Sequence, residues 1–196
     1  DHPASLVVHD SGARFNHHRG RPGRVSRSPA ASIVEHTRMT AIQDRIPHNH
    51  CYGCGPENPD GLQIKSYWDG NESVCTYLPR PEQCAGPTQY LYGGTIASII
   101  DCHSVCTSIA NYYERDGFAI GEGPAIWCVT GNLAVRYLKP IRIDNPVELR
   151  ATIRECSDRK TIVDCQVISE GDVTAVGEVI AIRVPETWRS DDEGKR

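Results

Sequence analysis

The 196-residue chain contains no hydrophobic run of the roughly 18 to 20 residues that a membrane-spanning helix requires. It also lacks a strong excess of either charge, because 21 Lys and Arg residues against 25 Asp and Glu residues leave a formal net charge of −4. This slight acidity argues against nucleic acid as the main partner. No internal repeat is present and 39% of the residues are hydrophobic, so we expect one soluble globular domain.

Methionine occurs only once, at position 39, and the residues before it differ from the rest of the chain. They are rich in Arg, Gly, Pro and Ser and poor in acid, so residues 1–45 are predicted to form a disordered leader. Two interpretations stay open: a non-native extension before Met39, or a removable transit peptide. We expect one domain over residues 46–188, a charged tail over 189–196 and a cytoplasmic location, or an organellar one if 1–38 are a transit peptide.

Nine cysteines are present, and most lie inside periodic segments, which favours reduced thiols in an intracellular compartment. Cys51 and Cys54 have the spacing of half a zinc site, with His48 and His50 as conceivable further ligands. Four ligands within seven residues would hardly surround one ion, and no second Cys-x-x-Cys follows. We therefore expect a Gly-, Pro- and Asn-rich turn that packs its cysteines, with no metal and no cofactor. Redox chemistry is disfavoured because the motif opens no helix in a βαβ unit.

Hydrophobic periodicity predicts one long helix among strands. Residues 91–113 carry apolar or small side chains at helical spacing, which indicates a mostly buried helix. Alternating patterns predict strands over 62–68, 74–78, 125–138, 147–155, 161–169 and 173–184, with Gly131 as a bulge. Short turns between successive strands imply an antiparallel sheet. We expect an α+β fold in which a curved sheet of about six strands wraps around the helix.

Asp101 is the one charged residue inside the predicted helix. An ionised carboxylate among apolar neighbours costs several kcal/mol unless something stabilises it, so its presence needs a reason. Gly93 and Gly94 open the helix, where free backbone N–H groups and the positive end of the dipole can receive an oxyanion. His103 lies two residues beyond Asp101 on a different face, and we expect it to be a core histidine with satisfied hydrogen bonds.

The spacing of these groups predicts a dimer. Gly94 and Asp101 are seven residues apart, or roughly 10 Å along a helix axis. Reacting atoms must approach to about 3 to 3.5 Å, so the carboxylate cannot attack a carbonyl held at the start of its own helix. Two antiparallel copies would bring each helix start to the middle of the other. A dimer of dimers remains open.

Three blocks of residues carry a family resemblance over about residues 51–185. They are Tyr92-Gly93-Gly94 with Asp101 eight residues after Gly93, the segments 129–133 and 137–140, and the lead-in Cys51-x-x-Cys54-Gly55-x-x-Asn58-x-x-Gly61-Leu62. In this order and spacing the chain resembles the hotdog-fold acyl-CoA thioesterases of the PaaI-like branch. The resemblance implies hydrolysis of an acyl-CoA thioester, with Asp101 as general base or nucleophile. It also implies that the Gly93 N–H contacts the thioester carbonyl and that Thr130 helps to place water.

Further residues are expected near the substrate. Tyr92 stands where the family usually has His, and Gln89 lies near, but offset from, an Asn or Gln that some relatives carry. If Gly131 leaves the strand register unchanged, Asn132 and Arg136 share a face with Thr130. Gly94, at the start of the helix, is also expected near the substrate. Five basic side chains are candidates for binding the CoA phosphates: Arg136, Lys139, Arg142, Arg159 and Lys160. Two other function classes remain open, a hotdog hydratase or dehydratase and a non-catalytic acyl-CoA-binding protein.

Overall fold

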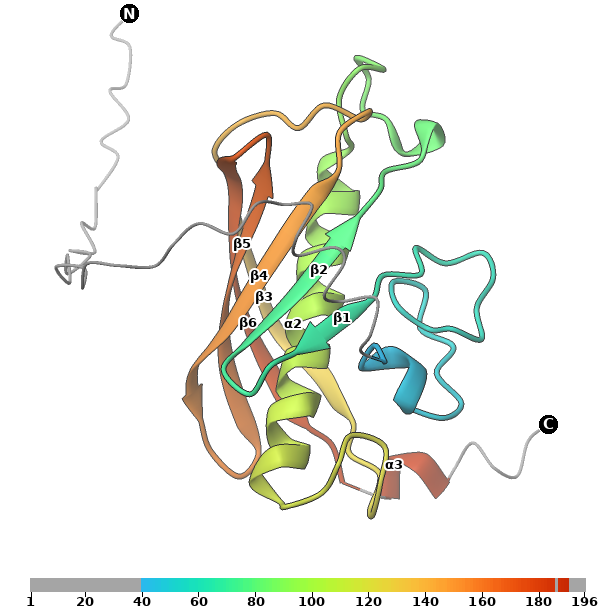
Figure 1. Ribbon diagram of the computed structural model, residues 1–196, viewed down its shortest axis with the longest axis vertical. Coiled ribbons are helices and arrows are strands. Elements are labelled where there is room, and N and C mark those ends of the chain that lie inside the picture. Colours follow the sequence, from blue (N-terminus) through green and yellow to red (C-terminus); the bar gives the residue numbers. More distant parts are fainter. Residues whose placement is uncertain (1–39, 186, 191–196) are drawn as a thin grey trace, which may run out of the picture.

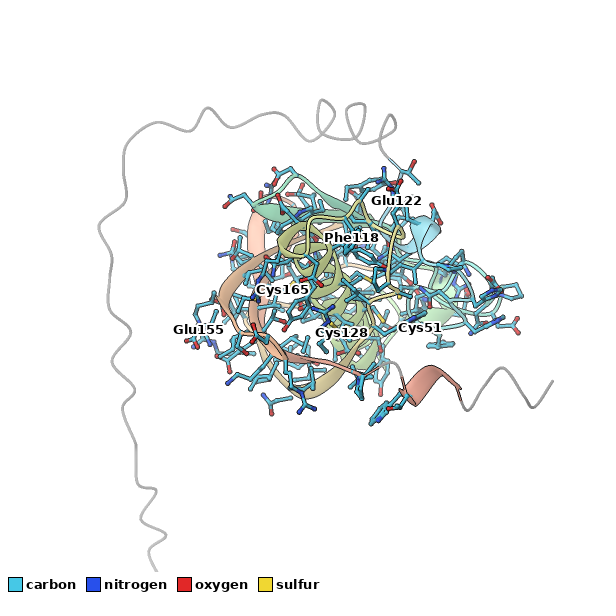
Figure 2. All side chains as sticks on the ribbon, turned by 90° about the horizontal axis from the view of Figure 1, so that it is seen from below. Cys51, Phe118, Glu122, Cys128, Glu155 and Cys165 are labelled. Atoms are coloured by element: carbon cyan, nitrogen blue, oxygen red, sulfur yellow. The ribbon has the colours of Figure 1, made fainter. Side chains whose placement is uncertain are left out.

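The computed structural model describes residues 40–185 and 187–190, and its centre is the helix α2, Gly93–Arg115. A six-stranded antiparallel sheet packs against this helix with every one of its strands (Figure 1). The strands are β1 (Ser66–Trp68), β2 (Glu72–Tyr77), β3 (Cys128–Tyr137), β4 (Val147–Cys156), β5 (Lys160–Ser169) and β6 (Asp172–Arg183). Their order in the sheet is β1-β2-β4-β5-β6-β3, which leaves β1 and β3 at the edges. Seen from below, the sheet curves around the helix (Figure 2), as the sequence predicts.

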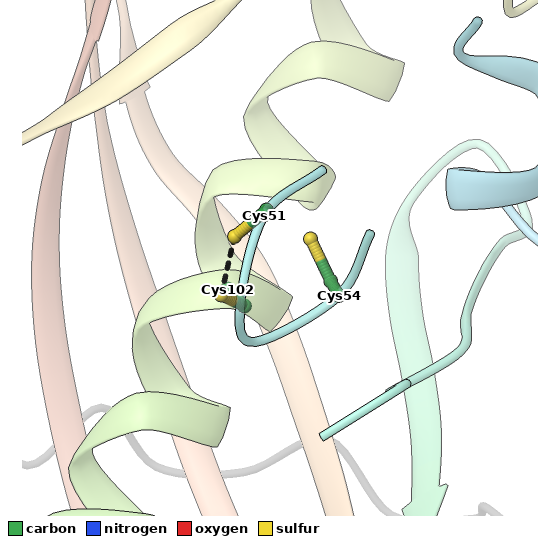
Figure 3. A group of neighbouring side chains, drawn as sticks. All are labelled: Cys51, Cys54 and Cys102. Carbon is green, nitrogen blue, oxygen red and sulfur yellow. Dashed lines mark hydrogen bonds between the residues drawn. The ribbon is translucent and has the colours of Figure 1, made fainter. Parts of the chain in front are cut away.

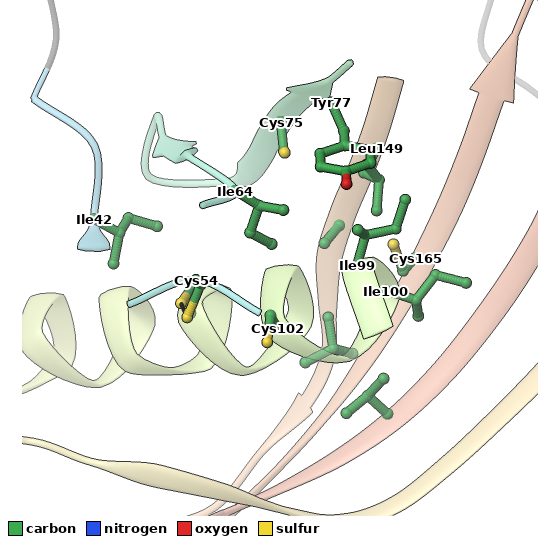
Figure 4. Packing of buried hydrophobic residues seen from close by; sticks show 14 of the residues in the cluster. Ile42, Cys54, Ile64, Cys75, Tyr77, Ile99, Ile100, Cys102, Leu149 and Cys165 are labelled. Atoms are coloured by element: carbon green, nitrogen blue, oxygen red, sulfur yellow. Dashed lines mark hydrogen bonds between the residues drawn. The ribbon is translucent and has the colours of Figure 1, made fainter. Parts of the chain in front are cut away.

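The helix is buried because its apolar positions meet the concave face of the sheet. Ile99 and Ile100 are fully buried and pack with residues of the neighbouring strands such as Leu149 (Figure 4). Gly177 of β6 permits the close approach, since a Cβ at this position would lie 2.4 Å from Cγ2 of Ile100. In the described part of the chain, no helix is long and apolar enough to cross a membrane.

The first strand is shorter than the sequence predicts. Residues 62–65 do not join the sheet; instead the N–H of Leu62 donates to the carbonyl of Tyr52 and that of Ile64 to the carbonyl of Gly53. Gln63 between them has a positive φ of 58°. The apolar alternation of this segment therefore serves packing against the turn that contains Cys51, and only its last three residues pair with β2.

Ordered structure begins before residue 46, the predicted start of the domain. The 3-10 helix η1, Gln43–Arg45, packs against the sheet, and Ile42 beside it is buried. The Gln43 side chain donates to Ser66 Oγ at 2.9 Å and accepts from the Ser66 N–H at 2.8 Å. These contacts place residues 40–45 in the fold rather than in a leader. The other leader residues, and most of the predicted tail, lie outside the described residues, and a short helix α3, Thr187–Ser190, follows the sheet.

The predicted bulge at Gly131 is present and reverses the side-chain alternation of β3. Thr130 pairs with Ala181 and Asn132 with Ile180, so Gly131 is the extra residue. Thr130 therefore faces the helix together with Leu133 and Tyr137, whose β6 partners are buried. Asn132 and Arg136 would share a face with Thr130 only if Gly131 left the register unchanged. That condition is not met, and both residues fall on the outer face of the sheet, opposite Thr130.

Candidate active site

Asp101 and Thr130 form the polar centre of the candidate site. Asp101 projects from the middle of α2 toward β3, where Thr130 Oγ1 donates a hydrogen bond of 2.5 Å to its Oδ1. Burial raises the pKa of the Asp101 carboxyl above its ordinary value, and the hydrogen bond from Thr130 acts in the opposite direction. The carboxylate is only partly shielded, so it can act as a base toward a molecule that enters from solvent.

A cavity of about 240 Å³ opens next to this pair. Its walls come from three parts of the chain: residues 46–54, which we call the N-terminal turn, the middle of α2, and the start of β3 with the residue before it. The lining is mostly apolar and sulfur-bearing, and Asp101 and Thr130 contribute the carboxylate and the hydroxyl: Ile46, Asn49, Cys51, Cys54, Asp101, Cys102, Val105, Cys106, Ile109, Trp127, Cys128, Val129 and Thr130. An apolar cavity with a few convergent polar groups is typical of a small-molecule site.

The start of α2 offers backbone donors. Tyr92 precedes the helix as its N-cap, and its side chain makes no capping hydrogen bond. Among the described residues, no group accepts a hydrogen bond from the N–H of Gly93 or Gly94, as is usual in the first turn of a helix. Tyr137 of β3 donates its hydroxyl hydrogen to the carbonyl of Gly93 at 2.8 Å, which holds the helix start against the sheet edge.

The two halves of the proposed chemistry are separated within one chain. Asp101 lies two turns beyond Gly93 and Gly94 on the same helix, so the distance along the axis is roughly 10 Å. The strand β3 runs beside α2 in the opposite direction, with Thr130 at the carboxylate and Tyr137 at the helix start. One chain therefore presents the base and the backbone donors at two different places on the same edge.

His103 takes no part in the cavity. It is fully buried, its Nδ1 lies 2.8 Å from Ser66 Oγ and its Nε2 lies 3.0 Å from the Ser73 carbonyl oxygen. Burial lowers its pKa to about 4. This is the core histidine that the sequence predicts.

The predicted phosphate-binding residues do not gather at one place within a chain. Lys139, just past the end of β3, pairs with Asp172 at 2.8 Å, near the helix start. Arg159 lies in the turn between β4 and β5 and Lys160 begins β5, near the far end of α2. The 23-residue helix between these places is about 34 Å long.

The remaining predicted residues lie at the surface. Arg142 pairs with Asp144 at 3.1 Å, and the carbonyl of Gln89 accepts from the Ile143 N–H. Gln89 and Asn132 are both exposed, as is the ring of Tyr92. None of these three side chains lines the cavity.

Sequence reasoning missed two groups that the structure brings to the site. Trp127, just before β3, and Cys128, its first residue, form one wall of the cavity. The hydrophobic periodicity predicted only that both residues belong to a strand. The thiols of Cys102 and Cys106 meet the turn of Cys51 and Cys54 at the opposite wall. The i, i+4 spacing of the helix cysteines is visible in the sequence, but nothing local indicates that a turn some 50 residues earlier packs on them.

Comparisons with known proteins identify the family and the fold. A profile described as thioesterase superfamily matches residues 88–176, which include the glycine pair, Asp101 and Thr130. A thioesterase superfamily protein from Shewanella loihica PV-4 is similar at 30% identity over 70% of this chain and 96% of that chain, with a TM-score of 0.53. No curated protein matches in a sequence search.

Two more distant structures share the fold. The PaaI protein of the E. coli phenylacetic acid degradation operon is 17% identical over 63% of this chain and 81% of its own, with a TM-score of 0.52. A thioesterase from Haemophilus influenzae is 14% identical over 63% of this chain and 79% of its own, also with a TM-score of 0.52. With a profile match across the site and a relative covered almost completely at 30% identity, this hotdog-fold chain belongs to the thioesterase superfamily.

Proposed function

We propose that the protein hydrolyses an acyl-CoA thioester to a free acid and CoA, with Asp101 as the general base. The observation that carries this proposal is the Asp101–Thr130 pair, a carboxylate of raised pKa that lines an apolar cavity. A base is more effective when its pKa approaches the working pH, and desolvation moves the carboxyl in that direction. The membership of the chain in the thioesterase superfamily supports the same reaction.

In the proposed reaction, water attacks the thioester carbonyl carbon while Asp101 takes one of its protons. Thr130 positions the carboxylate, and the negative charge that develops on the carbonyl oxygen is stabilised by the backbone N–H of Gly93. The intermediate then collapses, the carbon–sulfur bond breaks, and the CoA thiolate leaves with the proton that Asp101 returns. Direct attack by the carboxylate would instead form an anhydride. If water then attacks the aspartyl carbonyl carbon, one turnover in ¹⁸O-labelled water leaves label on Asp101, which the general-base route does not.

The Gly93 donor comes from a second subunit in this proposal. The edge strand β3 is ten residues long and exposes Val129, Leu133 and Tyr137, and an unpaired edge of this kind favours association. If two β3 strands pair antiparallel about a two-fold axis at Ala134, with Gly131 as the unpaired bulge residue, Thr130 of one protomer meets the partner subunit's Tyr137. Since Tyr137 binds Gly93, each carboxylate then faces the other subunit's helix start.

The same pairing supports a shared site for the CoA phosphates. The turn with Arg159 and Lys160 lies at the end of the sheet where β3 begins, and Lys139 follows the end of β3. An antiparallel β3 pair brings the beginning of one strand to the end of the other. The basic residues that one chain keeps apart are then combined from two chains.

Replacing Asp101 by Asn tests the proposal. We expect turnover of acyl-CoA to fall by about 10²- to 10⁴-fold, because the amide cannot accept the proton, while circular dichroism stays unchanged. Free thiol released from saturated and 2-enoyl acyl-CoAs is the measurement, with loss of the enoyl double bond followed in parallel. Unchanged thiol release in Asp101→Asn contradicts the assignment. Hydration of the enoyl substrate without thiol identifies a hydratase, and neither product identifies a binding protein.

A further inference from the structure

Three thiols from two distant parts of the chain meet at the wall of the cavity. Cys51 and Cys54 come from the N-terminal turn and Cys102 from α2, and their Sγ atoms all lie within 4.8 Å of one another (Figure 3). The sulfur atoms of Cys51 and Cys102 are 3.6 Å apart. A fourth thiol, that of Cys106 one helical turn later, lies 3.9 Å from the sulfur of Cys54.

The N-terminal turn is shaped for this convergence. A Cβ at Gly53 would lie 2.2 Å from the sulfur of Cys102, so only glycine lets the turn approach the helix so closely. At Gly55 a Cβ would lie 2.4 Å from the Asn49 carbonyl oxygen, and the Gly55 N–H donates to the Cys51 carbonyl at 2.8 Å. The buried amide of Asn49 also points its Nδ2 at the sulfur of Cys54, 3.9 Å away.

Two of the sulfur–sulfur distances are close to the spacing that a tetrahedral zinc ion demands. With zinc–sulfur distances of about 2.3 Å, tetrahedral geometry sets neighbouring sulfur atoms about 3.8 Å apart. The two sulfur pairs, at 3.6 and 3.9 Å, lie close to that value. The motif Cys-x-x-Cys on a turn combined with Cys-x-x-x-Cys on a helix also supplies two ligands from each side.

We propose that Cys51, Cys54 and Cys102, with Cys106 as the fourth ligand, bind one zinc ion that fastens the N-terminal turn to α2. Binding releases the thiol protons, because the thiolate is the form that coordinates the metal. Sequence spacing indicates only half of this site, Cys51 and Cys54; in the structure His48 and His50 lie beside Glu57, and the further thiol comes from α2.

The proposed role is structural and does not depend on the proposed hydrolysis. All four cysteines line the cavity, so a metal that joins them would hold one of its walls in place. Asp101 is adjacent to Cys102 in sequence, but its carboxylate accepts its hydrogen bond from Thr130 on β3. A disulfide between Cys51 and Cys102 is the competing chemistry. It needs an oxidant and joins only two thiols, whereas here three lie within 4.8 Å of one another and a fourth lies beside Cys54.

The test is metal content and metal spectroscopy of the full chain, reduced and then loaded with zinc. We expect about one zinc per chain by elemental analysis. Cobalt(II) in place of zinc should show the visible bands of tetrahedral coordination and thiolate-to-cobalt charge transfer in the near ultraviolet. Zinc at about one hundred times its dissociation constant should raise the midpoint of thermal unfolding by roughly 5–10 °C.

Two variants localise the ion. Cys51→Ala should lose metal binding, and because Cys51 is exposed its replacement leaves no cavity in the core. Cys128→Ala is the matched control, since Cys128 lines the same cavity from β3 but lies outside the sulfur group, and it should keep one metal per chain. Wild-type protein that binds no zinc after reduction overturns the proposal, as does binding that survives in Cys51→Ala. A mass two hydrogens lower in the protein before reduction, combined with failure of the reduced protein to bind metal, identifies the disulfide instead.

Discussion

Burial and the Thr130 hydroxyl shift the pKa of the Asp101 carboxyl in opposite directions. The apolar surroundings raise the pKa of the carboxyl by withholding water, and the Thr130 hydroxyl lowers it by donating a hydrogen bond to the charged form. In the proposed mechanism the ionised carboxylate is the active form, so activity is expected to be lost as the pH falls through this pKa. The proposal assigns the hydroxyl the role of keeping the carboxylate ionised and oriented, while burial keeps it basic enough to accept a proton.

Thr130→Val should shift the acidic limb of the kcat/KM profile to higher pH. Valine has nearly the same shape but no donor, so the pKa of Asp101 rises further, and turnover on the plateau should fall about 10- to 100-fold. Thr130→Ser keeps the hydroxyl and is the control that should stay near wild type. The profile is measured with one acyl-CoA over the stable pH range, and a limb that stays in place in Thr130→Val rules out this role of the hydroxyl.

At the scale of elements, the contact between α2 and the sheet sets the position of the site. The helix start is held by the Tyr137 hydroxyl, and its middle is held against β6 by Ile100, which fills the space above Gly177. A helix supported at both places presents Gly93 and Asp101 in fixed positions along the edge strand. The same rigidity makes the two contacts sensitive to small changes of side chain.

Gly177→Ala should lower the free energy of unfolding by about 1 to 3 kcal/mol, because the new methyl group overlaps Cγ2 of Ile100. Urea unfolding monitored by circular dichroism measures the change. Ile100→Leu removes that branch, so the double variant should lose less than the sum of the two single variants. Additive losses would mean that the two residues do not meet.

Gly93→Pro should cut turnover by about 10²- to 10³-fold by deleting one backbone donor. Proline is tolerated at the first helical position, and Tyr92 before it has φ −65° and ψ 133°, which suits a residue that precedes proline. Gly93→Ala keeps the N–H and adds only a methyl group at ordinary contact distance from Tyr137, so it serves as the control. Equal activity in the two variants would exclude the Gly93 N–H as the oxyanion donor.

At the scale of the whole molecule, the proposed site needs two chains. The edge position of β3 and the antiparallel course of α2 beside it place the base and the donor of one chain about two helical turns apart. A two-fold axis across β3 exchanges these positions between protomers. In this proposal the chemistry therefore requires the dimer. Dimer formation also covers the exposed edge strand β3.

Co-expressed Asp101→Asn and Gly93→Pro chains should recover activity that neither variant has alone. Half of randomly mixed dimers contain both chains, and each such dimer has one intact site of two, so about one quarter of wild-type turnover is expected. Thiol release by the purified mixture is the measurement, with a chain carrying both substitutions as the inactive control. No recovery in verified mixed dimers would place the base and the donor in the same subunit.

The sequence by itself determined the helix, the main strands and the choice of Asp101 as the candidate base. Helical spacing, strand alternation and the turn residues between strands are local properties, so they predicted α2, the antiparallel sheet and the bulge at Gly131. Asp101 stood out because a lone carboxylate among apolar residues is costly. Tertiary structure alone decided which segments meet: the reversed alternation after Gly131, the order that leaves β3 at the edge, and the turn of Cys51 packed on Cys102. These features depend on pairing and packing between residues far apart in the chain, which no local pattern encodes.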